Sequence, residues 1–146
     1  MPASAQAAEV VVGDVPGGIV QHAGYNWHPG SYTGAYTHLG SYKLKADAPN
    51  DAVETLAKTA IVPLLEKLLA DGTVIEYEVD QEAIHTESPS LFYIVYITKS
   101  AEGLDKVNAA VAEMFKTSPL LGPSFGSMAD FTDHRDYLSR KTAVYK

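Results

Sequence analysis

Hydrophobic and polar residues change period several times along the chain, and each change marks an expected element. Residues 35–45 alternate with a period of two, which predicts a β-strand. In residues 51–70 apolar positions recur every three or four residues, which predicts a helix about 30 Å long. Pro63 predicts a kink or break near residues 59–63. Gly72 follows as the expected left-handed cap.

The second half of the chain repeats this order. Its expected elements are strands at 73–84, 90–99 and 124–132 and a helix at 101–116. The last residues, 133–146, are polar and charged, and we expect a short helical turn and a tail there. The pattern therefore predicts strand–helix–strand–strand–helix–strand, an α+β domain covering residues 35–146.

Residues 1–34 form an arm rich in glycine and aromatic residues, without a clear period and with room for one short strand. Tyr25, Trp27 and Tyr32 suggest that the arm packs on something, because so many aromatic side chains seldom stay in water. Residues 1–8, MPASAQAA, resemble the cleavage end of a secretory signal without its apolar region. We favour export, and a bland terminus on a cytoplasmic protein remains the alternative.

The strand expected at residues 90–99 is apolar on both faces. Leu91, Tyr93, Val95 and Ile97 alternate with Phe92, Ile94 and Tyr96. A strand of this kind is covered on both sides, whereas two helices connecting such strands cover only one side of the sheet. The other side needs the arm, a second copy of the chain or a ligand, and we favour a second copy helped by the arm.

This order of elements, with its two-faced strand, resembles the ferredoxin-like dimeric α/β-barrel superfamily over residues 36–132. That superfamily includes antibiotic-biosynthesis-type monooxygenases and stress-responsive barrel proteins. The resemblance implies a four-stranded antiparallel sheet with two helices on one face, sheets paired face to face in a homodimer, and a small-molecule pocket between sheet and helices. For an enzyme it implies cofactor-independent oxygenation or proton transfer such as isomerisation. The resemblance rests on the order of elements and their hydrophobic pattern, and no catalytic motif is shared residue by residue.

Charge and composition exclude several classes of function. The net charge of −7 and the absence of any Lys/Arg run argue against nucleic acid and against an anionic membrane surface. No apolar stretch approaches the ~18 residues of a membrane span. Without cysteine the chain has no disulfide, thiolate metal site or Cys nucleophile. The histidines lack zinc-site spacing and no glycine-rich nucleotide motif is present, so we expect neither metal nor cofactor.

His38 is the strongest candidate for a general base, because it lies on an alternating strand beside tyrosines. Glu76 or Tyr93 are the candidates to assist it, should they project to the same side of the sheet. The competing interpretation is structural. Glu76 and Glu78 would then be solvated residues that keep an edge strand from aggregating.

Five further residues are candidate ligand contacts. Three aromatic side chains could line a pocket for an apolar or aromatic molecule, and the polar cluster at 130–136 could bind a ligand's anionic group through a guanidinium. The structural alternative is a filled core and a solvated turn whose charges satisfy one another. The five residues are Tyr36, Phe92, Tyr96, His134 and Arg135.

Two hypotheses of function follow from these patterns. The first is a homodimer that binds a small apolar or aromatic molecule, with or without catalysis. The second is a non-catalytic exported protein that assembles with itself through its arm. The first requires a cavity next to a base, and the second requires a filled core and a large contact surface.

Overall fold

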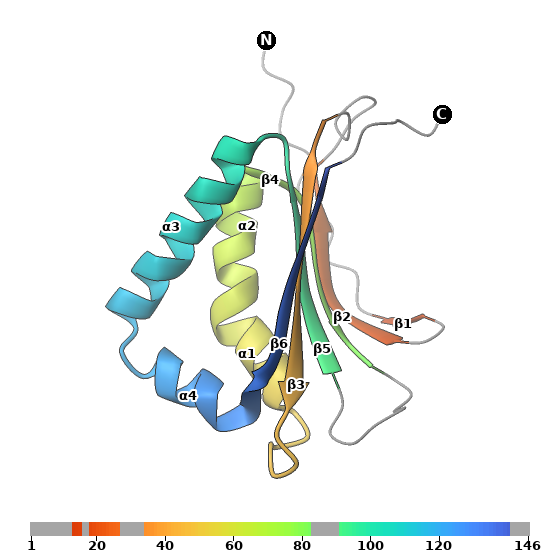
Figure 1. The fold of residues 1–146 in the computed structure, drawn as a ribbon, viewed down its shortest axis with the longest axis vertical. Coiled ribbons are helices and arrows are strands. Elements are labelled where there is room, and N and C mark those ends of the chain that lie inside the picture. The colour runs from red at the N-terminus through yellow and green to blue at the C-terminus, as the bar shows by residue number, and fades with distance from the viewer. Residues whose placement is uncertain (1–12, 16–17, 27–33, 83–90, 141–146) are drawn as a thin grey trace.

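The computed structural model describes residues 13–15, 18–26, 34–82 and 91–140. These residues form one antiparallel sheet with the helices on a single face, as Figure 1 shows edge-on. The strands are β1 (Gly13–Val15), β2 (Gly18–Tyr25), β3 (Tyr36–Leu44), β4 (Val74–Gln81), β5 (Leu91–Thr98) and β6 (Ala129–Arg140). The helices are α1 (Ala52–Leu56), η1 (Ala57–Ile61), α2 (Val62–Ala70), α3 (Ala101–Thr117) and α4 (Leu121–Met128).

The sheet is wider than the sequence predicted. Its order is β1-β2-β4-β5-β3-β6, in which the last four strands have the order of a ferredoxin-like domain. The expectation of a four-stranded sheet preceded by an arm is therefore wrong in the number of strands. Part of the arm is strand β2, which pairs with β4 from Ile19 opposite Gln81 to Tyr25 opposite Glu76. An unpaired strand edge is a ready template for another strand. The residues of β2 do not alternate between apolar and polar. They form a strand because they pair with the edge of β4.

The first long helix changes its winding where proline was expected to disturb it. The described helix passes through a π-helical segment, η1, before α2 begins, and Pro63 occupies the first turn of α2. Proline has no backbone N–H, and the first turn of a helix tolerates it because N–H groups there lack a partner within the helix. Gly72 has φ +81°, which confirms it as the left-handed residue after the helix.

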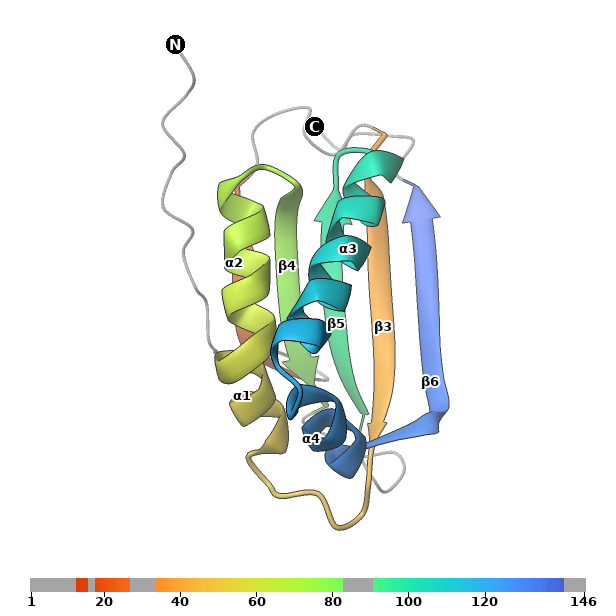
Figure 2. The ribbon, with the colours of Figure 1, turned by 90° about the vertical axis from the view of Figure 1, so that its left-hand side faces the viewer.

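The C-terminal part corrects two predictions. Residues 121–128 are helix α4 instead of a strand, because Phe125 and Met128, three residues apart, both pack into the core. The charged residues 133–140 are the larger part of strand β6 instead of a helical turn, because they pair with β3 at the sheet edge. Charged residues suit such a strand, since one side of it faces water. Figure 2 shows α4 beside the end of β3 and β6 running along the sheet edge.

The register assigns each side chain to one of two faces. Residues directly opposite each other in an antiparallel pair share a face, so His38, Tyr96 and Tyr77 lie together under the helices. Phe92 is 0% exposed there, packed in the main core with Val79 and the apolar sides of the helices. We call the other side the open face, because no described helix covers it (Figure 1). It carries half-buried Tyr93 and Val95, and Ile97 buried with Ala35 and Ile75.

No helix in the described ranges is long and apolar enough to cross a membrane.

Gly24 on strand β2 lies close to Tyr77 of β4 and Glu66 of α2. A Cβ atom at this position would lie 2.6 Å from Cε1 of Tyr77 and 2.9 Å from Oε1 of Glu66. Tyr77 is fully buried and donates a hydrogen bond to Glu66 from its hydroxyl. Neither neighbour is therefore able to move away without cost.

We predict that Gly24→Ala destabilises the protein by roughly 1–3 kcal/mol, as overpacking of a filled core does. Urea denaturation followed by circular dichroism measures this. Gly126→Ala in α4 is the matched control, because a Cβ there meets nothing within 4 Å and alanine favours a helix. A Gly24→Ala protein as stable as wild type would mean that β2 does not dock against Tyr77.

Candidate functional site

A cavity of about 450 Å³ lies between the helix face of the sheet and the helices. This volume is in the range of small-molecule sites. Its walls come from β3, β5 and β6 below and from the long helices and α4 above. The lining residues are His38, Tyr42, Leu56, Ala60, Ile61, Leu64, Leu65, Ile94, Tyr96, Val107, Asn108, Val111, Met114, Phe115, Leu121, Gly122, Phe125, Phe131 and Asp136.

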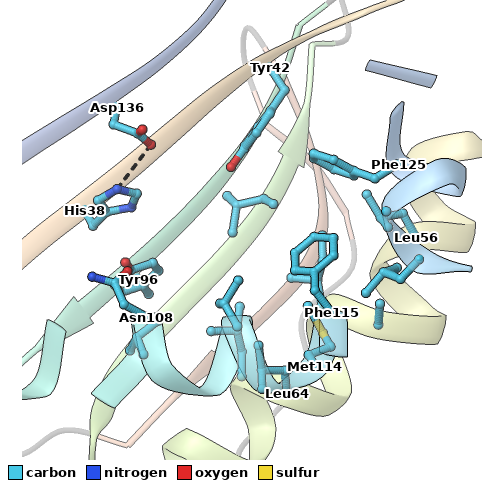
Figure 3. A pocket seen from close by; sticks show the side chains of 18 of the residues that line it. His38, Tyr42, Leu56, Leu64, Tyr96, Asn108, Met114, Phe115, Phe125 and Asp136 are labelled. Carbon is cyan, nitrogen blue, oxygen red and sulfur yellow. Dashed lines mark ion pairs between the residues drawn. The ribbon is translucent and has the colours of Figure 1, made fainter. Parts of the chain in front are cut away.

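The polar side chains gather at one end of the cavity. In Figure 3, His38, Tyr96, Asn108 and Asp136 lie together, while Leu64, Met114 and Phe115 lie at the other end. An apolar wall with a few convergent polar groups is the usual composition of a site that binds and orients a small organic molecule. The arrangement suits a ligand with an apolar body and a single polar group.

One carboxylate joins two histidines at the polar end. Asp136 Oδ1 lies 3.2 Å from His38 Nε2, and Asp136 Oδ2 lies 2.9 Å from His134 Nε2. His134 Nδ1 is 3.0 Å from the backbone carbonyl oxygen of Ser41. The carbonyl can only accept, so His134 Nδ1 carries a proton and donates it.

This geometry limits how His134 and Asp136 can form a hydrogen bond. A neutral His134 with its proton on Nδ1 presents only a lone pair to Asp136, and a lone pair does not bond to an ionised carboxylate. The contact at 2.9 Å is a hydrogen bond when either His134 is imidazolium or Asp136 is protonated. The three side chains therefore form a chain of polar contacts beside the cavity, from the Ser41 carbonyl through His134 and Asp136 to His38.

Burial controls the charge of the groups around this chain of contacts. Loss of solvent lowers the pKa of His38 below its usual 6.5, although the nearby Asp136 opposes that shift and His134 adds to it. His38 is therefore largely neutral at pH 7. Burial also raises the pKa of Tyr42 and of Tyr96 to about 12, each with a further contribution from Asp136. Both phenols thus stay protonated and able to donate hydrogen bonds.

Aromatic stacking holds the polar end in place. The Tyr42 ring lies between His134, at a centroid distance of 4.4 Å, and Phe92, at 5.1 Å. His38 stacks on Tyr96 at 4.8 Å. Gly40 allows this arrangement, because a Cβ atom there would lie 3.0 Å from the Tyr42 ring. The orientation of each polar side chain is therefore set by packing as well as by hydrogen bonds.

The structure does not bring the predicted assistants of His38 to it. The register places Glu76 and Tyr93 on the open face, on the other side of the sheet. Tyr93 instead donates a hydrogen bond to Glu82 Oε1 at 2.9 Å. The expectation that they share a side with His38 is wrong. Successive side chains of a strand point to opposite faces, and Glu76 is adjacent to Tyr77, which faces the helices, just as Tyr93 is adjacent to Phe92.

The five predicted ligand contacts are divided among different environments. Tyr96 lines the cavity, and His134 reaches it through Asp136. Phe92 is buried behind Tyr42 and is absent from the cavity wall. Tyr36 lies beneath the Arg140 guanidinium, 5.8 Å from its ring centre. Arg135 projects from the open face and is 70% exposed, 4.0 Å from Asp133.

Asp136, Tyr42 and Asn108 are cavity residues that the sequence did not single out as site residues. Asp136 belongs to the polar cluster at 130–136, for which the sequence favours a solvated turn. The sequence did contain a signal for Asp136. His134, Asp136 and Leu138 are two residues apart, so their side chains lie on one face if the segment is a strand. Across the described ranges, no group of three or more His, Cys, Asp or Glu side chains is arranged to hold a metal ion.

Comparison with known proteins places the fold. No family model matches the chain, and no curated protein matches it. It is similar to a dimeric ferredoxin-like protein from an uncultured marine organism, with a TM-score of 0.59 and 12% identity over 80% of this chain and 95% of that chain. A dimeric protein of unknown function with a ferredoxin-like fold from Bacteroides fragilis matches with a TM-score of 0.45 and 12% identity, over 75% and 99% of the two chains. The first similarity confirms the predicted α+β ferredoxin-like fold.

We predict that Asp136→Asn lowers the pKa of His38 still further. Both the charge of Asp136 and its hydrogen bond raise that pKa, and the amide removes the charge. An NMR titration of the histidine ring protons measures the change. Asp133→Asn is the matched control, because Asp133 lies on the same strand as Asp136 but pairs with Lys43 of β3 instead of His38. An unchanged titration of His38 in Asp136→Asn would show that the two side chains are not in contact.

Proposed function

We propose that this protein binds a small, largely apolar carbonyl or phenolic compound in the cavity and transfers a proton on it. The observation that carries the proposal is the Asp136 carboxylate that joins His38 and His134 at the polar end of an otherwise apolar cavity. The same wall holds two tyrosine hydroxyls that remain donors at neutral pH. A base beside hydrogen-bond donors is what enolisation of a carbonyl compound requires.

The proposed step needs no cofactor. The His38–Asp136 pair takes a proton from the carbon next to the carbonyl group. The C–H electron pair becomes the new C=C bond, and the carbonyl π electrons move to oxygen, where Tyr42 or Tyr96 donates a hydrogen bond. Return of a proton to carbon completes an isomerisation or an exchange. Asp136 is 53% exposed, so the pair can exchange its proton with water. Cofactor-independent oxygenation would begin with the same removal of a proton.

Neutral His38 provides the base. If its Nε2–H donates to Asp136, the lone pair is left on Nδ1, which is buried and has no hydrogen-bond partner among the described residues. The His38 ring must therefore turn to present this lone pair to a compound in the cavity. Asp136 then fixes the tautomer and stabilises the imidazolium that forms, as a carboxylate does for a catalytic histidine elsewhere. His134 does not line the cavity and acts through Asp136.

We predict that filling the cavity abolishes binding. Val111→Phe places a larger side chain on the cavity wall, whereas Ala112→Phe adds the same ring to the exposed side of α3. With 2-tetralone as an aromatic ketone probe, saturation-transfer NMR should show binding to wild type and to Ala112→Phe. The signal should fall at least about tenfold in Val111→Phe. Equal binding by both variants would contradict the proposed location.

We also predict that the protein catalyses exchange of the α-protons of 2-tetralone in D₂O. His38→Gln should slow this reaction by about 10²–10⁴-fold, the usual contribution of a general base. The rate should fall as the pH drops, with a midpoint below 6.5, because burial lowers the pKa of His38 and only its neutral form is basic. Asp133→Asn is the control. If His38→Gln catalyses the exchange as fast as wild type, His38 is not the base, and the proposed proton transfer is contradicted.

The open face supports a partner, and we propose a second copy of this chain. Half-buried Tyr93 and Val95 lie at its centre, with Tyr25 43% exposed and Tyr137 54% exposed toward its sides. Covering such apolar surface is favourable by about 25 cal/mol per Å². The similar protein from the uncultured marine organism is described as dimeric. Self-association and the chemistry of the cavity are compatible, because they use opposite faces of the sheet.

A further inference from the structure

Side chains on the open face are arranged in rows across the strands. The register places Asp80, Tyr93, Ser41 and Arg135 side by side on β4, β5, β3 and β6. The next row is Glu78, Val95, Leu39 and Tyr137, and the one after it is Glu76, Ile97, Thr37 and Ser139. Each row therefore begins with a carboxylate on β4 and ends with a hydrogen-bond donor on β6.

Charge is divided between the two halves of this face. Three acidic residues lie on β4, whereas Lys43 and Arg135 lie on the other side of β5. Asp133 is the acidic residue that contacts both cations, 3.7 Å from Lys43 Nζ and 4.0 Å from Arg135 Nε. Arg135 is 70% exposed, and Asp80 Oδ1 is buried with no hydrogen-bond partner among the described residues. Asp80 and Arg135 therefore lie in the same row, on opposite halves of the face.

Resting on the proposed self-association, we infer that a second copy docks on the open face about a two-fold axis that runs along the strands between β5 and β3. This axis places β4 of each copy over β6 of the other. Asp80 then faces Arg135 of the second copy, and Glu78 faces Tyr137. The third row lies outside this contact, because Ile97 is already buried there against Ala35 and Ile75. Val95 lies over Leu39, so the centre is apolar and the outer positions are complementary.

A two-fold axis across the strands is disfavoured by charge. It would place β4 over β4 and bring the three carboxylates of one copy against those of the other. Like charges brought together in an interface cost several kcal/mol, and such pairs select against wrong arrangements. The distribution of charge over the face therefore determines the orientation, while its apolar centre supplies the area.

The pairing should depend on pH. Burial, followed by the charge of Glu78, raises the pKa of Asp80 to about 7. Tyr93 lies opposite Asp80 on β5, and burial, followed by its hydrogen bond to Glu82, raises the pKa of Tyr93 to about 12, so its phenol stays neutral. Glu82, which accepts that hydrogen bond, is a further carboxyl group beside this row. An arginine from the second copy lowers the pKa of Asp80, so association releases protons and strengthens as the pH rises through about 7.

Complementary charge reversals test the orientation. In Asp80→Lys the two facing positions are both basic, and in Arg135→Asp they are both acidic, so each variant should form its own dimer at least about tenfold more weakly than wild type. In a mixture of the two variants, both contacts regain opposite charges. Native mass spectrometry of the mixture should therefore show the heterodimer in excess over both homodimers.

Asp105→Lys and Arg140→Asp are the matched controls. The first changes an exposed position on α3, and the second changes the arginine on the other side of β6. Both should dimerise as wild type does. Because Asp80 is half-buried, Asp80→Asn provides a milder variant, in which dimerisation should lose its dependence on pH near 7.

The outcomes separate the two proposals. A wild-type chain that is monomeric at micromolar concentration would overturn self-association and this orientation together. A wild-type dimer whose two variants show no preference for the heterodimer, and whose Asp80→Asn form keeps its pH dependence, would overturn the orientation alone. Self-association through another arrangement would then stand.

Discussion

The pairing of β6 with β3 is the constraint on which the candidate site depends. Between two regions of regular pairing, β6 advances from Asp130 to Arg135 while β3 advances only from Lys43 to Ser41. This irregularity lets His134 turn under the helices and donate to the Ser41 carbonyl. Regular pairing then resumes and sets Asp136 opposite Gly40, within reach of His38. Without the edge strand the cavity would keep its apolar wall and lose its carboxylate.

The sheet separates two roles between its faces. A strand exposes alternate residues on opposite sides, so β3 presents His38 and Tyr42 to the cavity while Leu39 and Ser41 project to the open face. A change on one face need not disturb the other. This is the physical basis for proposing proton transfer under the helices and association on the opposite side, and for expecting the two to be separable by mutation.

The cavity itself has a thermodynamic meaning. Apolar side chains that border an unfilled volume lose dispersion contacts, and larger volumes cost more stability. Ala60 and Gly122 are small residues on this wall, and larger side chains there would narrow the space. The chain therefore retains a volume that simple optimisation of packing would close. Occupation by a ligand would recover those contacts, which agrees with the proposed binding.

The sequence by itself determined the central elements. Periodicity predicted the strand at 35–45, found at 36–44, and the helix at 101–116, found at 101–117. It also predicted the helix disturbed near Pro63, the left-handed Gly72 and the two strands β4 and β5, because local spacing of apolar residues and the backbone limits of proline and glycine decide those features. It also selected His38 and the two-faced strand. It failed for β2, α4 and β6, whose residues have weak or charged patterns and gain their conformation from the strand edge or core surface that they contact.

Only the tertiary structure decided which polar residues meet. His38 and Asp136 are distant in sequence, and nothing local indicates that a bulged edge strand brings them to 3.2 Å. Glu76 and Tyr93 were plausible partners from their strands, yet register, which is set between strands rather than within them, placed both on the other face. Local sequence determined the central elements, whereas long-range pairing determined the edge strands and which polar side chains meet.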